Sequence, residues 1–127
     1  MESDEFVRLV EIALLNENGK TAKKQEVWRA IRANLKTLSE MLQPKQVQQL
    51  AATLPPDIGV YLVPTNTSEH DTLNDFFHYV AIRERTTLPR AIHHSRTIIA
   101  VLQEAVPADV VQMVREQLPQ EFAPLFE

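Results

Sequence analysis

The sequence predicts an all-α protein, and two observations carry this prediction. Only 2 of the 127 residues are glycine, whereas Leu, Ala, Gln and Glu, which favour helices, are used heavily. Apolar residues also recur every three or four positions over long stretches, which is the period of an amphipathic helix. We therefore expect a single compact helical domain over residues 1–127, large enough to bury roughly two thirds of its unfolded surface.

The two halves of the chain repeat each other, and this predicts how the helices are organised. Residues 5–12 match residues 75–82, and residues 35–55 match residues 99–119. Each repeat would cover the apolar face of the other, as expected of a tandem duplication. The expected parts are a first repeat (3–63), a polar joint (64–71) and a second repeat (72–127), with three main helices in each repeat.

In the first repeat, turn and cap residues separate three helices. Ser3 is a candidate N-cap of the first helix, and Gly19 suits its C-terminal end. Thr21 can cap a second, longer helix, and Pro44 suits the first turn of a third helix. Pro55 and the proline after it end this third helix. The expected buried positions are Phe6, Leu9, Val10, Ala13, Leu14, Trp28, Ile31, Leu35, Leu38, Leu42, Val47, Leu50, Ala51 and Leu54.

The end of the first repeat admits two interpretations. Residues 60–63 have the composition of a β-strand. The matching residues 121–126 of the second repeat are poorly suited to a strand, so a short helical turn is favoured for 58–63 and the strand is kept as an alternative.

The second repeat begins again with a helix cap. Thr72 and Asp75 form a near capping box, Thr87 precedes a second long helix, and Pro107 opens the last main helix. The expected inward positions are Phe76, Tyr79, Val80, Ile82, Ile92, Ser95, Ile99, Leu102, Val106, Val110, Val111, Val114 and Leu118.

The repeated pattern resembles a known family. A Phe-x-x-x-Val helix, a long Leu-rich helix, a Leu-Pro pair and a final apolar turn occur in each half, as in the bacterial domain-of-unknown-function family 2267. The resemblance covers essentially the whole chain. It implies an all-helical, soluble bacterial protein, with no established catalytic or binding residues to transfer. The matching residues are Phe6, Val10, Leu35, Leu38, Leu54, Pro55, Phe76, Val80, Leu102, Leu118, Pro119, Leu125 and Phe126.

Charge and composition argue against several classes of partner. The net charge of −4 gives no general attraction to nucleic acid or to an anionic membrane. The longest apolar runs, such as 98–102, are far shorter than the ~20 residues that span a bilayer. The acidic N-terminus does not resemble a signal peptide, and the absence of cysteine is compatible with a reducing compartment. We expect a cytoplasmic protein.

The residues that carry enzyme chemistry are not arranged for it. No Glu has a His three residues later and no two His are three or four residues apart, so we expect no metal site and place all four histidines on the surface. No serine lies in a Gly-x-Ser-x-Gly turn, and two isolated glycines cannot form a phosphate loop. We expect neither a cofactor nor an enzymatic activity.

Three cations at helical spacing are the candidate functional residues. Arg29, Arg32 and Lys36 form a basic stripe on the outward face of the second helix. The plain interpretation is a solvated face; the sharper one is a contact surface for an acidic protein partner. The sequence thus favours a non-enzymatic interaction or scaffold module, a monomer rather than a dimer. The alternative is a protein that binds a small apolar ligand between the repeats.

Overall fold

A computed structural model describes residues 1–14, 23–65 and 72–127. All regular secondary structure in these ranges is helical, so the all-α prediction is confirmed. No helix among the described residues is long and apolar enough to cross a membrane. The elements are α1 (Ser3–Ala13), α2 (Lys24–Ser39), α3 (Pro44–Ala52), α4 (Pro56–Gly59), α5 (Leu73–Glu84), α6 (Leu88–Ala105), α7 (Ala108–Gln117) and the 3-10 helix η1 (Gln120–Phe126).

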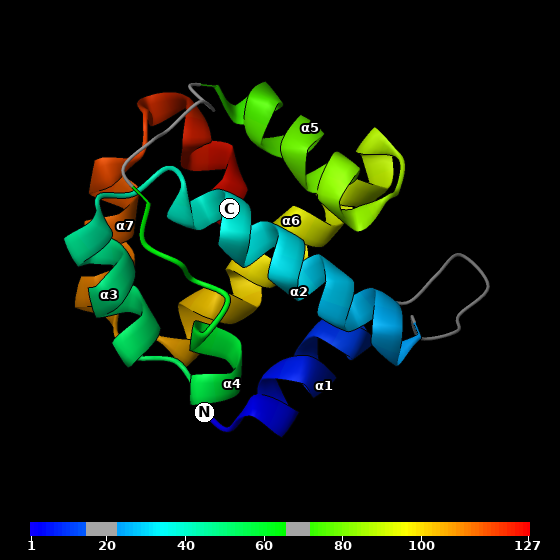
Figure 1. Ribbon diagram of the computed structural model, residues 1–127, viewed down its shortest axis with the longest axis horizontal. Coiled ribbons are helices and arrows are strands. Elements are labelled where there is room, and N and C mark those ends of the chain that lie inside the picture. The colour runs from blue at the N-terminus through cyan, green and yellow to red at the C-terminus, as the bar shows by residue number, and fades with distance from the viewer. Residues whose placement is uncertain (15–22, 66–71) are drawn as a thin grey trace.

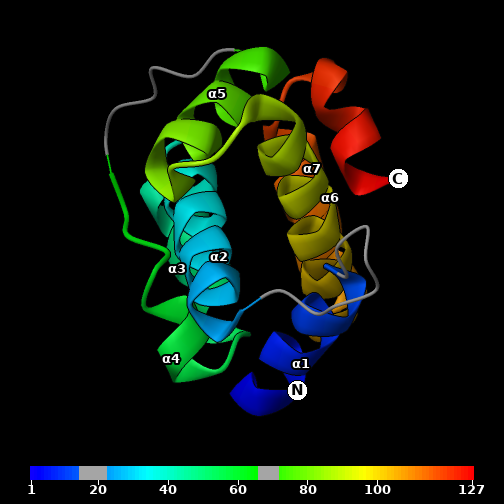
Figure 2. The same ribbon diagram turned by 90° about the vertical axis from the view of Figure 1, so that its right-hand side faces the viewer.

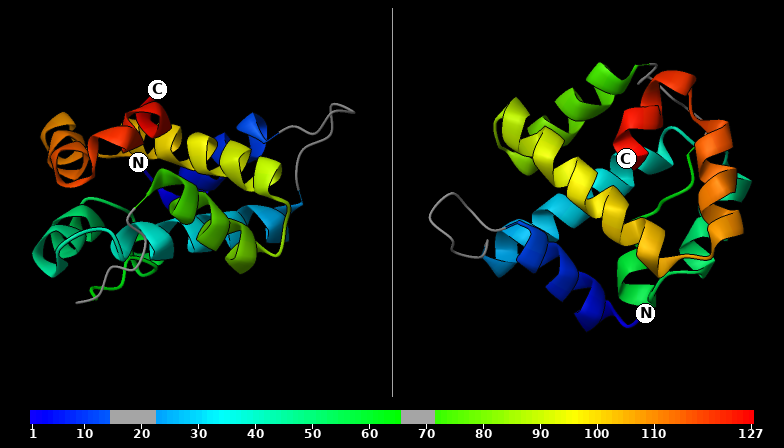
Figure 3. Two further views of the ribbon diagram at one scale, coloured as in Figure 1. Left: turned by 90° about the horizontal axis from the view of Figure 1, so that it is seen from above. Right: turned by 180° about the vertical axis from the view of Figure 1, so that it is seen from behind.

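The two long helices, α2 and α6, cross at the centre of the molecule (Figure 1). Helices α2, α3 and α4 lie on one side of the molecule, and α6, α7 and η1 lie on the other (Figure 2). The same two layers are visible from above in Figure 3. Helices α1 and α5 lie at opposite ends, and each packs against both α2 and α6.

The contacts of α1 and α5 interlock the two halves of the chain. Helix α1 belongs to the first half but packs against α6, and α5 belongs to the second half but packs against α2. Helices α3 and α7 also meet across the two layers. In each half, three longer helices are followed by one short helical segment. The division into two tandem three-helix repeats stays a prediction, as does the duplication behind it.

The helix caps show where local sequence was sufficient. Thr72 is an N-cap as predicted, and Thr87, which was expected only to precede its helix, is an N-cap too. Each hydroxyl oxygen accepts a hydrogen bond from a backbone N–H three residues later. The prediction for Ser3 is wrong, because Ser3 is already helical and Glu2 occupies the cap without a side-chain hydrogen bond. Gly19 and Thr21 lie outside the described residues, and α2 begins at Lys24.

The connection from α3 to α4 is built from prolines and one glycine. Pro44 stands in the first turn of α3, as predicted, but α3 already ends at Ala52, and Pro56 then begins α4. A Cβ atom on Gly59 would lie 2.8 Å from the backbone oxygen of Ala51, so α4 approaches α3 as closely as only glycine permits. Residues 56–59 are helical, and 60–63 form a turn and an irregular segment. The strand alternative is therefore wrong, and the helical turn favoured for 58–63 is right only for 58 and 59.

The core follows most of the predicted inward positions. Phe76 lies at its centre, with its ring centroid 6.0 Å from that of Phe122 in an edge-on arrangement. Ile82 is the clearest error, with an exposed fraction of 69%. It lies about 240° around the helix from Phe76, and therefore faces solvent when Phe76 and Val80 face α2 and α6. The largest fully buried side chains are Phe6, Val10, Ile31, Leu35, Leu38, Leu50, Ile58, Phe76, Ile98, Ile99, Phe122 and Leu125.

Several other predicted inward positions are only partly covered. Trp28, Tyr79, Val110 and Val111 are half-buried, because they lie at the edges of their helices' apolar faces. Ala13, in the last turn of α1, is exposed. These residues border the core rather than fill it.

Candidate functional site

The basic stripe lies on the solvent-facing side of α2. Arg29, Arg32 and Lys36 are all exposed, whereas the intervening positions Ala30 and Leu35 are fully buried. The stripe therefore follows one face of a helix whose opposite face is fixed in the core. Its geometry makes it available for contact, and its role stays a prediction.

A hollow of about 510 Å³ adjoins the N-terminal half of this stripe. Two half-buried aromatic residues border it, with the Trp28 and Tyr61 ring centroids 6.3 Å apart at an interplanar angle of 64°. Lys36 is one helical turn beyond Arg32 and outside the hollow. The hollow thus combines cations with an aromatic edge, which suits a ligand that carries both carboxylates and an apolar group. Its lining residues are Lys24, Gln25, Trp28, Arg29, Arg32 and Tyr61.

A smaller hollow of about 100 Å³ lies on the other side of Arg29, where α5 ends and α6 begins. Two of its lining residues are buried and ionisable, namely Glu84 at 4% exposure and His94 at 9%. The Nδ1 atom of His94 is 2.5 Å from the Glu84 Oε1 atom. A carboxylate can only accept, so Nδ1 carries the hydrogen of this bond. The lining residues are Glu26, Arg29, Glu84, Arg85, Thr86, Arg90 and His94.

This pair corrects the prediction that all four histidines are solvated surface groups. His94 is buried because it continues the inward face that includes Ala91 and Ile98. Its acidic partner is one turn after Val80, on the apolar stripe of α5. The sequence contained a signal for this pair, because Glu84 and His94 both fall on the inward faces of two consecutive helices. This signal was missed in the prediction from sequence.

The other histidines behave differently. His78 and His93 are exposed as predicted, and His70 lies outside the described residues. Partial burial, together with the charge of the neighbouring His94, lowers the pKa of His93 below its ordinary value of 6.5. His93 and His94 therefore differ in environment although they are adjacent.

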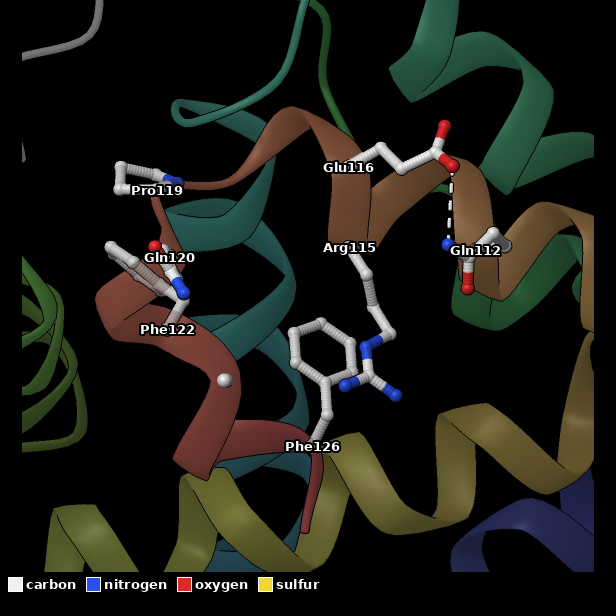
Figure 4. A pocket seen from close by; sticks show the side chains of 8 residues that line it. Gln112, Arg115, Glu116, Pro119, Gln120, Phe122 and Phe126 are labelled. Carbon is white, nitrogen blue, oxygen red and sulfur yellow. Dashed lines mark hydrogen bonds between the residues drawn. The ribbon is translucent and has the colours of Figure 1, made fainter.

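A third hollow of about 230 Å³ lies between α7 and η1. Figure 4 shows the guanidinium group of Arg115 over the Phe126 ring, and its central carbon is 5.3 Å from the ring centroid. On the same helix, the Gln112 side-chain amide donates a hydrogen bond of 3.1 Å to Glu116. The hydrogen bond lies within α7, whereas the Arg115–Phe126 contact joins α7 to the C-terminal segment.

Arg83 of α5 and Glu40, which follows the last residue of α2, form an ion pair that joins the two helices. The Arg83 guanidinium contacts both carboxylate oxygens of Glu40, at 2.5 and 3.0 Å, and also donates to the Thr37 hydroxyl at 2.8 Å. This two-point contact fixes the orientation of α5 on α2. It thereby positions the end of α5, where Glu84 and Arg85 border the small hollow.

The fold and these surfaces define the molecule as an all-helical protein with charged hollows around a central pair of crossing helices. Within the described residues, no group of three or more His, Asp or Glu side chains could hold a metal ion. The chain belongs to the family described as "Uncharacterized conserved protein (DUF2267)", whose model matches residues 3–125. The family predicted from the sequence is therefore confirmed. A search of curated proteins found no match.

Proposed function

We propose that this protein is a non-enzymatic interaction module that binds an acidic segment of a partner protein through the outward face of α2. The observation that carries this proposal is the hollow beside the basic stripe, in which Arg29 and Arg32 stand next to the Trp28–Tyr61 aromatic pair. Cations with an aromatic border favour a segment in which acidic residues flank an aromatic or aliphatic side chain.

The electrostatics of the chain support selectivity for such a partner. The net charge is −4, so most of the protein repels an acidic segment. The cluster of exposed cations is a local positive region that attracts it. Arginine presents a planar fork that can pair with both oxygens of a carboxylate, and two of the three stripe residues are arginines. The stripe lies on a helix held in the core, so little backbone entropy is lost on binding.

The remaining parts of the proposal concern the context of this surface. The protein acts as a cytoplasmic bacterial monomer, and its two interlocked halves, 3–63 and 72–127, arose by internal duplication. The equivalent chain order of the halves supports the duplication. In the second half, positions equivalent to the stripe hold His93, Arg96 and Ala100, so the stronger cationic face belongs to the first half alone.

The alternative of an apolar ligand between the repeats has less support. Large side chains already fill the space between the layers. Phe76 packs against Phe122, and Ile31 and Ile98 are also fully buried. A ligand of drug-like size occupies a cleft of roughly 300–1,000 Å³. The one hollow of that size described above is bordered by three cations, which suits an acidic ligand better than an apolar one.

The test is charge reversal of the stripe with a control of equal charge change. Partners captured from the native cell are purified, and their affinity is measured for the wild type, for R29E/R32E/K36E and for R8E/K45E/R96E. The control residues are exposed cations on α1, α3 and α6. We expect the stripe variant to lose at least about tenfold in affinity, equivalent to about 1.4 kcal/mol. The control should lose much less, and equal losses in the two variants would refute the proposal.

A further inference from the structure

The chain that follows α4 has the composition of a β-strand but no strand to pair with. Residues 60–63 are Val, Tyr, Leu and Val, three of which belong to residue types favoured in strands. The segment follows the outer side of the layer formed by α2 and α3 (Figures 2 and 3). Val60 is 63% exposed and Val63 is 58% exposed, which places them among the most exposed large apolar side chains that the structure describes.

The backbone of this segment is open at Val63. The N–H groups of the three preceding residues donate to carbonyl groups of α4, at 3.0–3.2 Å. The N–H and C=O groups of Val63 have no hydrogen-bond partner in the described part of the chain. Pro64 disfavours the helical conformation at Val63 and favours an extended one. An extended residue with both groups free can exchange two hydrogen bonds with a residue of an added antiparallel strand.

The segment is fixed in place beside the cationic hollow. Leu62 is buried in the core, and the Tyr61 ring packs edge-on against Trp28 at a centroid distance of 6.3 Å. Tyr61 also lines the hollow that contains Arg29 and Arg32. Two residues span at most about 7 Å, so the open backbone of Val63 is close to these cations. Because its neighbours are already anchored, little order has to be gained when the segment binds a partner.

We propose that the acidic partner segment binds in an extended form and pairs its backbone with Val63, as an added strand; this rests on the function proposed above. Successive side chains of an extended segment point to opposite faces. A segment that alternates apolar and acidic residues therefore covers Val60 and Val63 with one set and reaches Arg29 and Arg32 with the other. Main-chain hydrogen bonds supply affinity in this mode, and the side chains supply specificity.

A helical partner suits this surface less well. The backbone groups of a helix are bonded within the helix, so a helical segment has none to offer to Val63. Water alone could also bond to the exposed backbone of Val63, but hydration gives no reason for two neighbouring valines in solvent. An added strand accounts for the open backbone, the exposed valines and the adjacent cations together.

The first test compares two capped octapeptides of equal composition and charge. One alternates glutamate and valine, and the other has four glutamates followed by four valines. Binding to the full chain is followed at low ionic strength by the fluorescence of Trp28, the only tryptophan, which borders the hollow. We expect the alternating peptide to bind at least about tenfold more tightly. Equal binding of the two peptides, or no binding of either, would overturn the inference.

Backbone methylation tests the hydrogen bonds themselves. In an extended segment, the N–H groups of alternate residues point to opposite edges. The alternating peptide is therefore made in two forms, one N-methylated at its valines and the other at its glutamates. Only one edge pairs with Val63, so one form should lose at least about tenfold in affinity while the other binds nearly as the parent does. Equal affinity of the two methylated forms would refute strand addition.

Variants of the protein test the same contact from the other side. Val63→Pro removes the open N–H group and should weaken binding of the alternating peptide about fivefold relative to Val63→Thr, which retains it. V60S/V63S should also weaken binding, whereas the control I12S/I82S changes two exposed apolar residues of α1 and α5 and should not. Circular dichroism melts check that each variant is folded. Equal affinities of V60S/V63S and I12S/I82S would show that the valines do not take part.

Failure of this inference is distinguishable from failure of the proposed function. R29E/R32E/K36E should weaken binding of both octapeptides, because both are acidic. If the stripe variant loses affinity for both while the two methylated forms bind equally, the cationic surface stands and the strand pairing is wrong. If captured partner proteins bind the stripe variant as tightly as the wild type, the proposed function itself is wrong.

Discussion

Replacing Phe76 with alanine should destabilise the whole molecule through the junction of α5 with the opposite layer. Phe76 is fully buried and contacts the rings of Phe77 and Phe122, each at a centroid distance of 6.0 Å. Truncating a buried phenylalanine costs about 3–5 kcal/mol. With an unfolding entropy of about 2.1 cal/mol/K per residue, a 127-residue chain should lose about 11–19 °C in melting temperature.

A control on the same helix makes this magnitude interpretable. Ile82 is an apolar residue of α5 that is 69% exposed, so Ile82→Ala should change the free energy of unfolding by less than about 0.5 kcal/mol. If Ile82→Ala were as damaging as Phe76→Ala, the orientation of α5 described above would be wrong. A loss below about 1 kcal/mol in Phe76→Ala would refute the buried position itself.

The assay also tests whether the two halves unfold together. Trp28 is the only tryptophan and lies in the first half, whereas Phe76 lies in the second. Denaturant unfolding is followed by Trp28 fluorescence and by far-ultraviolet circular dichroism. Because α5 packs on α2, the Phe76→Ala substitution should move both transitions by the same amount. A fluorescence midpoint that stayed in place while the helical signal shifted would show that the halves are independent.

Three further predictions concern other parts of the fold. Leu54→Ala and Leu118→Ala should each lower the free energy of unfolding by about 2–5 kcal/mol in chemical denaturation, since both leucines are buried, and small losses at both would place the Leu-Pro pairs on the surface. Gly59→Ala should destabilise by about 1–3 kcal/mol because its Cβ would press on the Ala51 carbonyl, which must shift; an unchanged melting temperature would contradict that close approach. Because the pKa of His93 is lowered in the folded state, the unfolded chain binds a proton more readily. The free energy of unfolding should therefore decrease as the pH falls below 6.5. His93→Gln should flatten the melting temperature between pH 7 and pH 5 relative to wild type, and an identical pH profile would exclude this contribution.

Much of the secondary structure could be predicted because its causes are local. Thr72 and Thr87 cap their helices through hydrogen bonds that span three residues, and Pro44 starts a helix through its own fixed φ. The period of the apolar residues identified most of the core for the same reason. Ser3 failed as a cap because one extra helical residue at a fraying end changes little in free energy, so a local preference does not decide it.

The candidate sites depend on residues far apart in the chain. The exposed stripe on α2 was visible in the sequence, because helical spacing alone places Arg29, Arg32 and Lys36 on one face. The aromatic border was not, because Tyr61 reaches Trp28 only through the path of α3 and α4. Sequence periodicity describes which side of a helix a residue occupies and contains no information about which other helix meets that side.

The sequence by itself determined the helical class and most of the buried positions, because both follow from short-range spacing and composition. The family was recognised from the resemblance of the whole chain to its other members. Only the tertiary structure decided that α1 and α5 pack across to the opposite half. It also decided that Glu84 and His94 form a buried pair beside three arginines. Such pairings are set by the crossing of α2 and α6, where burial of apolar faces brings charged groups together whatever their separation along the chain.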